Sequence, residues 1–197
     1  MVASATRCLS GLGSLYGLQA TDLADAPNTT PSEFIFRSFH NTKELENRHF
    51  APYYFGKAGT IPSQNLVDAF PMQNGYPISH ALSDYDESDP YANRDKRFYL
   101  NVYYHGAQYG NSGLAVDVTS RGKDSPSFDP YGSRSGYYLA KFLSKNETML
   151  DPILSANAIH YYPLLRKAEV FLNYAEAANE AWARRGIRGV TPIRPTT

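Results

Sequence analysis

The chain has 197 residues, which is enough for one domain with a buried core. Its 19 lysines and arginines balance 19 aspartates and glutamates, so no net charge attracts nucleic acid or an anionic membrane, and nucleic-acid binding is not expected. Because Cys8 is the only cysteine, an internal disulfide and a paired-cysteine metal or redox site are excluded.

The N-terminal segment, residues 1–31, is expected to be irregular. Arg7 stands directly before Cys8, where a bacterial lipoprotein signal needs a small residue after an apolar run, so Cys8 is not expected to carry a lipid. The glycine-broken stretch LSGLGSLYGLQA that follows is too short to span a membrane. After a turn-rich stretch, EFIFR places Phe34 and Phe36 on one face and predicts a short strand.

A long loop with its own packing is expected from His40 to Ile61, because aromatic, histidine and amide residues follow one another there without clear periodicity. The stretch PSQNLVDAFPM then predicts a short helix. Ser63 is suited to cap its start, and Pro71 ends it.

The stretch SDYDESDPYANRDKR is the most acidic part of the chain. A calcium loop starting at Asp84 would need glycine at the position of Asp89 and a bidentate glutamate at the position of Asp95. A solvated turn in which acidic residues pair with Arg94 and Arg97 is therefore favoured. Whether the segment binds calcium stays open.

Two alternating stretches follow. RFYLNVYYHG predicts a strand, and GLAVDVT predicts a second one that pairs with it across the glycine-rich GAQYGNSG. GYYLAKFL is open between a strand and a short helix. SKNETMLDPILSANAIHYYP is read as a connection to the last helix.

The most regular stretch is RKAEVFLNYAEAANEAW, residues 166–182. Gly186 supplies the expected helix stop. Because an isolated amphipathic helix is marginal in water, this helix needs a packing partner. Residues 183–197 are expected to form a disordered tail. The apolar residues that share one face of the helix are Leu164, Ala168, Phe171, Ala175, Ala178 and Trp182.

The sequence lacks the motifs of common catalytic chemistries. No phosphate-binding loop occurs, and GSRSG carries Arg134 where a nucleophile elbow needs serine. The 5 histidines lack zinc-site spacing. A glycosidase needs two converging carboxylates, and a chain with 19 acidic residues does not single out a pair. We therefore expect no catalytic residue, no metal and no cofactor.

Five segments in order resemble motifs of the SusD/RagB family, the surface nutrient-binding lipoproteins of Bacteroidetes polysaccharide-utilisation systems. They are SEFIFR, PSQNLVDAFPMQNG, YANRDKRFYLNVYYHG, GYYLAKFL and LLRKAEVFLNYAEAANEA. The resemblance covers residues 32–182 and implies a mainly α fold with small β-hairpins and long loops, the C-terminal half of an α-rich fold. In complete relatives the last helix packs on an N-terminal helical scaffold, so its partner is expected to be missing and the chain alone to be marginally stable.

The resemblance also implies a function. A family member is a noncatalytic glycan-binding protein at the surface of the outer membrane, which delivers oligosaccharide to a SusC-like TonB-dependent transporter. Membrane association would be through a lipid anchor that this chain lacks. Three alternatives stay open: a peptide-binding import partner, a glycan-active hydrolase and a nonfunctional fragment.

The candidate binding residues come from the loop after EFIFR, because the family motifs do not fix them. This loop combines ring faces, which stack on sugar rings, with groups that bond hydroxyls. The candidate ligand-binding residues are Asn41, Arg48, His49, Tyr53, Tyr54 and Phe55.

Overall fold

The computed structural model describes residues 6–7, 10–13, 15–17 and 32–186. Contacts between residues divide the chain into two units. We call the described residues before 40 together with residues 161–186 unit 1, and residues 40–160 unit 2. Residues 18–31 of the expected irregular segment, residues 187–197 of the expected tail, and Cys8 lie outside the described residues. Among the described helices, none combines the length and apolar character that a membrane span requires.

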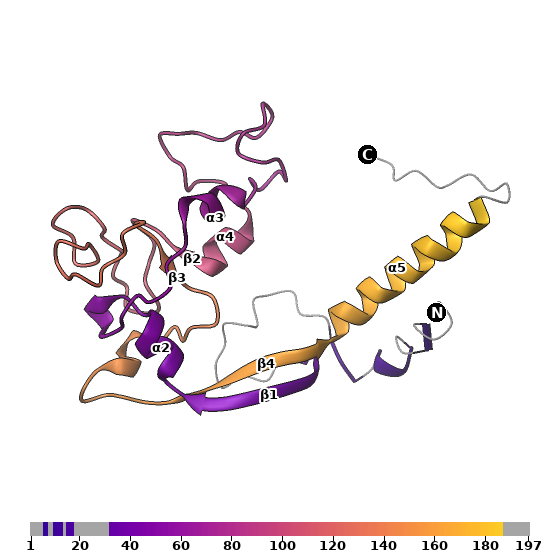
Figure 1. Cartoon of the computed structure of the whole chain (residues 1–197), viewed down its shortest axis with the longest axis horizontal. Helices are drawn as coiled ribbons and strands as arrows, with labels where there is room; N and C mark the ends of the chain where they lie inside the picture. Colours follow the sequence, from indigo (N-terminus) through magenta and orange to yellow (C-terminus); the bar gives the residue numbers. More distant parts are fainter. Residues whose placement is uncertain (1–5, 8–9, 14, 18–31, 187–197) are drawn as a thin grey trace. The chain divides into compact units, whose positions relative to one another are not determined.

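The two longest strands pair with each other. β1 (Phe34–Thr42) and β4 (Ala158–Arg166) form a two-stranded sheet, and Figure 1 shows that they run in opposite directions. Within unit 1, the ring centres of Phe39 and Tyr161 lie 6.3 Å apart, and the guanidinium of Arg37 lies 5.2 Å from the centre of the Tyr161 ring. β1 confirms the strand predicted at EFIFR. β4 lies in a stretch that the sequence predicts as a connection, so that prediction is wrong.

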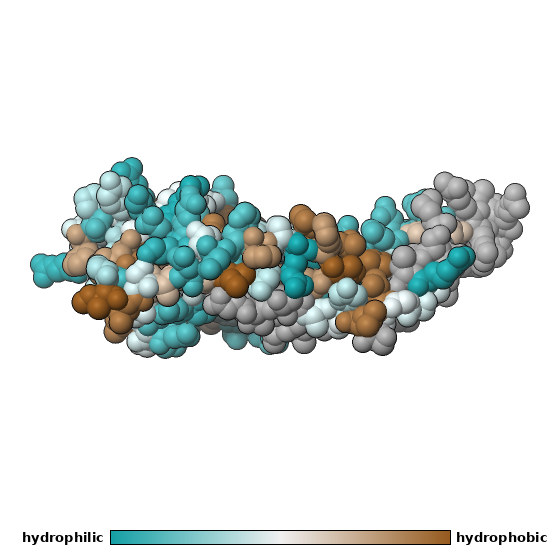
Figure 2. Space-filling model, turned by 90° about the horizontal axis from the view of Figure 1, so that it is seen from below, coloured by the Kyte–Doolittle hydropathy of each residue, from teal (hydrophilic) through white to brown (hydrophobic). Residues whose placement is uncertain are grey.

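α5 (Lys167–Gly186) follows β4 without a loop and confirms the predicted helix from Lys167 onward, whereas Leu164, which the sequence placed on its apolar face, and Arg166 lie in β4. The backbone N–H of Lys167 donates to the carbonyl of Glu33 at 3.1 Å, which ties the first turn of α5 to the start of β1. Figure 2 shows hydrophobic surface gathered around the end of β4 and the beginning of α5. Within the described part of unit 1, this apolar surface is therefore not buried. Its exposed residues include Phe36, Phe39, Leu164, Phe171 and Leu172.

Unit 2 consists of short elements and long connections. Its helices have 6 residues each: α2 (Glu44–His49), α3 (Gln64–Ala69) and α4 (Lys96–Asn101). Two 3-10 turns are η1 (Pro52–Tyr54) and η2 (Glu147–Leu150). β2 (Val102–Tyr103) and β3 (Tyr138–Leu139) pair antiparallel, with Val102 opposite Leu139 and Tyr103 opposite Tyr138.

The expected fold class, mainly α, is wrong. Among the described helices, only α5 is longer than two turns, and irregular connections dominate unit 2. These connections are rich in glycine, proline, asparagine, aspartate and serine, which favour turns over helix. The described part of the chain is mixed, with short helices, two small sheets and long connections.

Two hydrophobic clusters hold unit 2 together. The larger one gathers residues from η1, β2, β3, η2, the start of β4 and the connections between them, and the smaller one joins α3, α4 and β2. The larger cluster consists of Phe50, Ala51, Tyr54, Tyr103, Tyr109, Val116, Tyr138, Ala140, Leu143, Met149 and Ala158. The smaller cluster consists of Val67, Phe98, Val102 and Tyr137. Aromatic rings supply much of both clusters, and tyrosine is the most frequent aromatic residue in them.

The stretch RFYLNVYYHG, predicted as one strand, is helical in its first half, and only Val102 and Tyr103 form a strand. The side chain of Asp95 accepts a hydrogen bond of 2.8 Å from the N–H of Arg97 and caps α4, which starts at Lys96. This cap stabilises the first turn of a helix, and the alternating pattern does not reveal it. β2 pairs with β3 and not with GLAVDVT, which settles GYYLAKFL as containing a strand. GLAVDVT does form an antiparallel hairpin, but with the residues just after β2, since Ala115 bridges Gln108 and the N–H of Val116 donates to the carbonyl of Ala107 at 2.8 Å.

The short helix predicted after the long loop is confirmed as α3. The hydroxyl of Ser63 accepts a hydrogen bond of 3.3 Å from the N–H of Leu66 and caps the helix as expected. The loop expected from His40 to Ile61 is only partly correct, since it contains the end of β1, α2 and η1.

Among the described residues, Arg94 pairs with no acidic side chain, contrary to the expectation. Its buried guanidinium donates to the carbonyls of Pro90 at 2.9 Å, Val67 at 2.6 Å and Phe70 at 2.9 Å. Two of these carbonyls lie at the C-terminal end of α3, where backbone acceptors lack partners within the helix. Arg94 therefore stabilises the C-terminal end of α3 by hydrogen-bonding its backbone carbonyls. The other expected arginine, Arg97, does pair with Asp95, at 2.8 Å.

Candidate functional site

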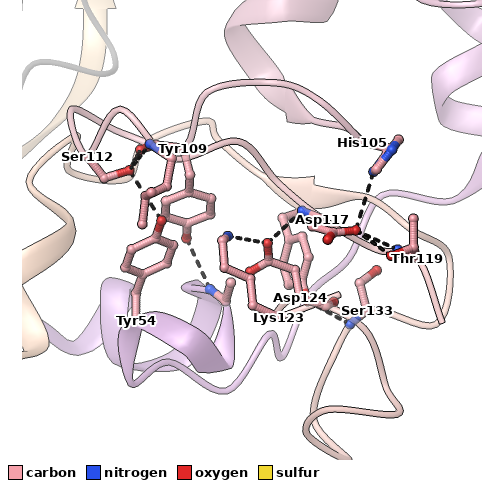
Figure 3. A network of polar contacts seen from close by, with 12 residues as sticks. Tyr54, His105, Tyr109, Ser112, Asp117, Thr119, Lys123, Asp124 and Ser133 are labelled. Atoms are coloured by element: carbon pink, nitrogen blue, oxygen red, sulfur yellow. Dashed lines mark hydrogen bonds and ion pairs between the residues drawn. The ribbon is translucent and has the colours of Figure 1, made fainter. Parts of the chain in front are cut away.

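The candidate site begins with a buried pair of tyrosines. Tyr54, in η1, stacks on Tyr109 with ring centres 4.3 Å apart and planes 15° from parallel. The Tyr109 hydroxyl accepts a hydrogen bond of 3.0 Å from the N–H of Ala51, and the Tyr54 hydroxyl lies 3.2 Å from the hydroxyl of Ser112 (Figure 3). Burial raises the pKa of Tyr109 well above its ordinary value. This pair forms a rigid support rather than an exposed binding surface.

Two exposed rings lie at the surface beside this support. Tyr53 is 41% exposed and meets Tyr54 edge to face, with ring centres 5.1 Å apart and planes 87° apart. Phe128, which is 60% exposed, has its ring centre 6.4 Å from that of Tyr53. Neighbouring exposed rings of this kind offer flat apolar faces to a ligand. We call Tyr53 and Phe128 the ring platform.

A lysine ammonium completes the surface next to the platform. Lys123 Nζ lies 4.8 Å from the centre of the Tyr53 ring and 5.4 Å from that of Tyr54, within the range of a cation–π interaction. The same ammonium pairs with Oδ2 of Asp124, whose side chain is fully buried. The ion pair of Lys123 with the buried Asp124 thus holds the ammonium in place against the Tyr53 ring.

Asp124 organises the connection that carries Lys123. Its Oδ2 accepts a hydrogen bond of 2.8 Å from the N–H of Asp117, while no donor in the described part of the chain reaches its buried Oδ1. The Tyr138 hydroxyl donates to the Asp124 carbonyl at 2.5 Å and accepts from the N–H of Ser133 at 2.9 Å (Figure 3). Burial raises the pKa of Tyr138 to about 12. The segment around the platform is therefore anchored to the larger cluster.

An exposed carboxylate and an imidazole flank this network. Asp117 Oδ1 accepts hydrogen bonds from the hydroxyl of Thr119 at 2.7 Å and from its N–H at 3.0 Å. These bonds, the hydroxyl's first, lower the pKa of Asp117. Nδ1 of His105 lies 4.0 Å from the same oxygen. Both side chains are about half exposed, so they can offer hydrogen bonds to a ligand at the surface.

The structure brings only part of the predicted site together. Tyr53 lies at the surface as a binding residue should, whereas Tyr54 is 6% exposed and packs in the core. Asn41 is exposed in β1, and Phe55 is exposed after η1 with a left-handed φ of 64°. No observation tests whether the predicted residues bind a ligand, so they stay predictions.

The two predicted residues in α2 differ in setting. Arg48 is exposed and pairs with Glu44, at 3.2 Å, within the same helix. His49 is half-buried, and within the described residues its Nδ1 has no hydrogen-bond partner. Burial, and then the nearby charge of Arg48, lowers the pKa of His49.

Sequence reasoning missed Lys123 and Phe128. Both lie in the connection after GLAVDVT, far along the chain from Tyr53. The one local signal was a large apolar ring in the otherwise polar stretch SPSFDPYGS.

The acidic stretch from Asp84 to Asp95 uses its carboxylates locally. Asp86 accepts hydrogen bonds from the N–H of Ser88 at 2.8 Å and from its hydroxyl at 2.7 Å, and Asp95 pairs with Arg97. Across the described part of the chain, no three His, Cys, Asp or Glu side chains group as a metal ion would require.

Solved structures that resemble this chain include two proteins of Bacteroides fragilis. One is a SusD-like carbohydrate binding protein, 24% identical with a TM-score of 0.64, and the match covers 88% of this chain and 35% of that one. The other is a SusD-like protein, 25% identical with a TM-score of 0.55, and the match covers 90% of this chain and 40% of that one. The chain thus spans less than half the length of either protein. Comparison with curated proteins finds no match.

The sequence model described as the SusD family matches residues 28–187. This range contains all five motifs that carry the resemblance seen in the sequence, and it covers most of the chain. The resemblance is therefore confirmed, and the chain belongs to the SusD family.

Proposed function

We propose that this chain binds oligosaccharide without catalysing its breakdown, and that the ring platform of Tyr53 and Phe128 is where a sugar stacks. The observation that carries the proposal is the arrangement of two exposed rings, 6.4 Å apart, beside a lysine ammonium and on a buried tyrosine support. One of the solved structures that the chain resembles is a carbohydrate binding protein, which supports the same class of ligand.

The platform suits a polyhydroxylated ring. The apolar face of a sugar can lie on an aromatic ring while its hydroxyls reach polar groups at the rim. Lys123 supplies a donor near the rings, and Asp117 and His105 supply further polar groups along the same connection. Because Tyr54 and Tyr109 hold the platform in place, little ordering is needed on binding.

Three surface carboxyl groups are not suited to serve as the acid of a glycosidase. The pKa shifts found for carboxyl groups, at Asp86, Asp95 and Asp117, are all downward. A glycosidase needs a carboxylic acid whose pKa is raised so that it can protonate the leaving group. These three groups are instead held as carboxylates.

We also propose a role in nutrient uptake, based on membership of the family. A surface-exposed, outer-membrane lipoprotein of this family would hold the oligosaccharide and deliver it to a SusC-like TonB-dependent transporter. For this chain, the surface location, the lipid anchor and the transporter are part of the proposal, supported by its membership of the SusD family.

Calorimetric titration of the full chain tests the ring platform. The probes are four neutral hexasaccharides: maltohexaose, cellohexaose, xylohexaose and mannohexaose. We expect at least one of them to bind, and we expect Tyr53→Ala and Phe128→Ala each to weaken that binding by about tenfold, as the loss of one ring stack would. The matched control is Tyr131→Ala, an exposed tyrosine for which no ring contact occurs within the described residues. Binding that survives both ring substitutions unchanged would remove the platform.

A further inference from the structure

A separate pocket of about 360 Å³ lies elsewhere on unit 2. Its lining residues come from the turn after α3, from the start of the acidic stretch, and from the residue before Arg94. They are Met72, Gln73, Asn74, Ser83, Asp84 and Asn93. The volume is within the range of small-molecule sites, toward its lower end.

Backbone pairing fixes the frame of this pocket. Met72 forms an isolated bridge with Arg94, and the N–H of Gln73 donates to the carbonyl of Asn93 at 2.8 Å. Met72 is 2% exposed, and its N–H donates to the carbonyl of Tyr76 at 2.9 Å. The pocket is therefore part of the folded structure and does not need to form around a ligand.

Two lining residues have unusual backbone conformations. Asp84 has a φ of 56° and Asn93 a φ of 53°, both in the left-handed region that residues other than glycine rarely adopt. Such conformations require support from the surrounding structure, and they occur preferentially at binding sites. They turn the backbone at two places on the pocket lining.

The polar groups of the pocket divide into engaged and free ones. The Asn74 amide donates to the carbonyl of Leu82 at 2.9 Å and to Oδ2 of Asp84 at 3.2 Å, so it serves the frame. Ser83 is similarly engaged, since its hydroxyl donates to the carbonyl of Ile78 at 3.1 Å.

The free groups are the side-chain amides of Gln73 and Asn93 and the Oδ1 atom of Asp84. Within the described part of the chain, no hydrogen bond engages any of the three. Each amide can both donate and accept, and the carboxylate oxygen accepts. The pocket therefore offers unused partners to a ligand that carries several neutral hydroxyls.

The charges of the lining disfavour anionic ligands and calcium. No lysine or arginine lines the pocket, so an anionic ligand would face Asp84 without a counter-charge. A single carboxylate is also a poor site for calcium, which takes about six to eight oxygen ligands, commonly from several carboxylates. Nearby in the same loop, Tyr76 and His80 stack with ring centres 4.5 Å apart, which gives this region an aromatic surface as well.

We propose that this pocket is a second sugar-binding subsite, in which Gln73, Asn93 and Asp84 bond the hydroxyls of one neutral sugar residue. The inference rests on the proposed oligosaccharide-binding function. It adds a site that lies in neither the ring platform nor the loop from His40 to Ile61.

The test uses the full chain and the same four neutral hexasaccharides. Gln73→Ala removes one free amide, and Asn93→Gly removes the other with a residue that adopts a positive φ without strain. We expect each to weaken hexasaccharide binding by about fivefold to tenfold, the effect of losing one or two hydrogen bonds. Asn157→Ala, at an exposed asparagine outside the pocket, serves as the matched control and leaves affinity unchanged.

Amide NMR signals supply a readout that does not depend on folding of a variant. In the unaltered chain, saturating hexasaccharide is expected to shift the side-chain amide resonances of Gln73 and Asn93, but not that of Asn157. Hexasaccharide binding that shifts neither pocket amide overturns the subsite, whatever the variants do.

The outcomes separate this inference from the proposed function. If Tyr53→Ala weakens hexasaccharide binding but Gln73→Ala and Asn93→Gly do not, the subsite is overturned and the ring platform is retained. If none of the four hexasaccharides binds, both are overturned. Titration with calcium chloride tests calcium as the alternative ligand. Calcium binding that Asp84→Asn abolishes would identify the pocket as a cation site and overturn the sugar assignment.

Discussion

Oε1 of Glu46 lies 3.1 Å from Nε2 of His160, and both side chains are buried. The same carboxylate oxygen accepts a hydrogen bond of 3.0 Å from the N–H of Ser144. Glu46 lies in α2, His160 in β4 and Ser144 in the connection before η2, so one buried side chain ties together three parts of unit 2.

Glu46→Ala should destabilise the fold strongly. It leaves the His160 ring and the Ser144 N–H buried without their acceptor, which costs about 3 kcal/mol of unfolding free energy. Urea denaturation measures the change. Glu44→Ala in the same helix is the matched control, because its pairing with Arg48 is exposed and contributes less than about 1 kcal/mol. Equal losses for the two variants would contradict the role of Glu46.

Lys123→Met should also destabilise the fold, because it removes the ammonium that pairs with the buried Asp124 carboxylate. A buried charge left without its partner costs about 3 kcal/mol. The double variant Lys123→Met/Asp124→Asn keeps an acceptor for the Asp117 N–H and removes the unpaired charge, so it should recover more than half of the loss. Urea denaturation of the three chains provides the measurement. A double variant no more stable than Lys123→Met would contradict the pairing.

Stability should fall in alkaline solution through Tyr138. The unfolded chain releases this phenol proton near the ordinary pKa of 10.0, whereas the folded chain holds it until the pKa of about 12. The stabilisation is therefore complete below pH 10 and is lost as the pH rises toward 12. Tyr138→Phe should reduce this alkaline decline, as followed by urea denaturation across the range.

At neutral pH the same substitution should be destabilising. It removes the donor to the Asp124 carbonyl and the acceptor of the Ser133 N–H, a loss of about 1–3 kcal/mol. An alkaline decline as steep in Tyr138→Phe as in the unaltered chain would show that this phenol is not the group responsible.

Asp95 should stabilise α4 in a manner that acid removes. The hydrogen bond from the Arg97 side chain is the first cause that lowers the pKa of Asp95 to about 2. The stabilisation is thus present above the ordinary pKa of 3.8 and disappears as the pH falls toward 2. Asp95→Ala should cost about 1 kcal/mol in neutral solution, the usual effect of losing a helix cap.

Asp95→Asn separates the cap from the ion pair. Asparagine caps helices well, so this variant should lose less than Asp95→Ala, and its deficit against the unaltered chain should shrink on acidification. Thermal unfolding from neutral to acidic pH follows the difference. A deficit that does not depend on pH would show that the ion pair with Arg97 contributes nothing.

The elements predicted correctly are those whose signals are local. The Ser63 cap, the strand at EFIFR and the amphipathic α5 each depend on residues within a few positions of one another. α4 shows how two local signals compete. Its alternating pattern favours a strand. The Asp95 cap instead stabilises a helix there, and the strand that follows, β2, is short and pairs with the distant β3.

The candidate site, too, could be predicted only where the sequence signal is local. Tyr53 was recognisable as an aromatic residue in a long loop, but nothing near it in sequence indicates that Phe128 and Lys123 come to lie beside it. Tyr54 next to it looked equivalent, and only its stacking on Tyr109 shows that it belongs to the core. Chain folding, rather than local composition, separates a ring that meets solvent from one that does not.

The ribbon of β1 and β4 gives this molecule an unusual vulnerability. In a sheet of two strands both are outermost, so along the described residues each leaves one row of backbone N–H and C=O groups without a neighbouring strand. Such rows can recruit an identical ribbon and start a growing polymer. Pro163, in the middle of β4, has no N–H to donate, so β4 offers an identical ribbon one backbone donor fewer than a strand without proline would.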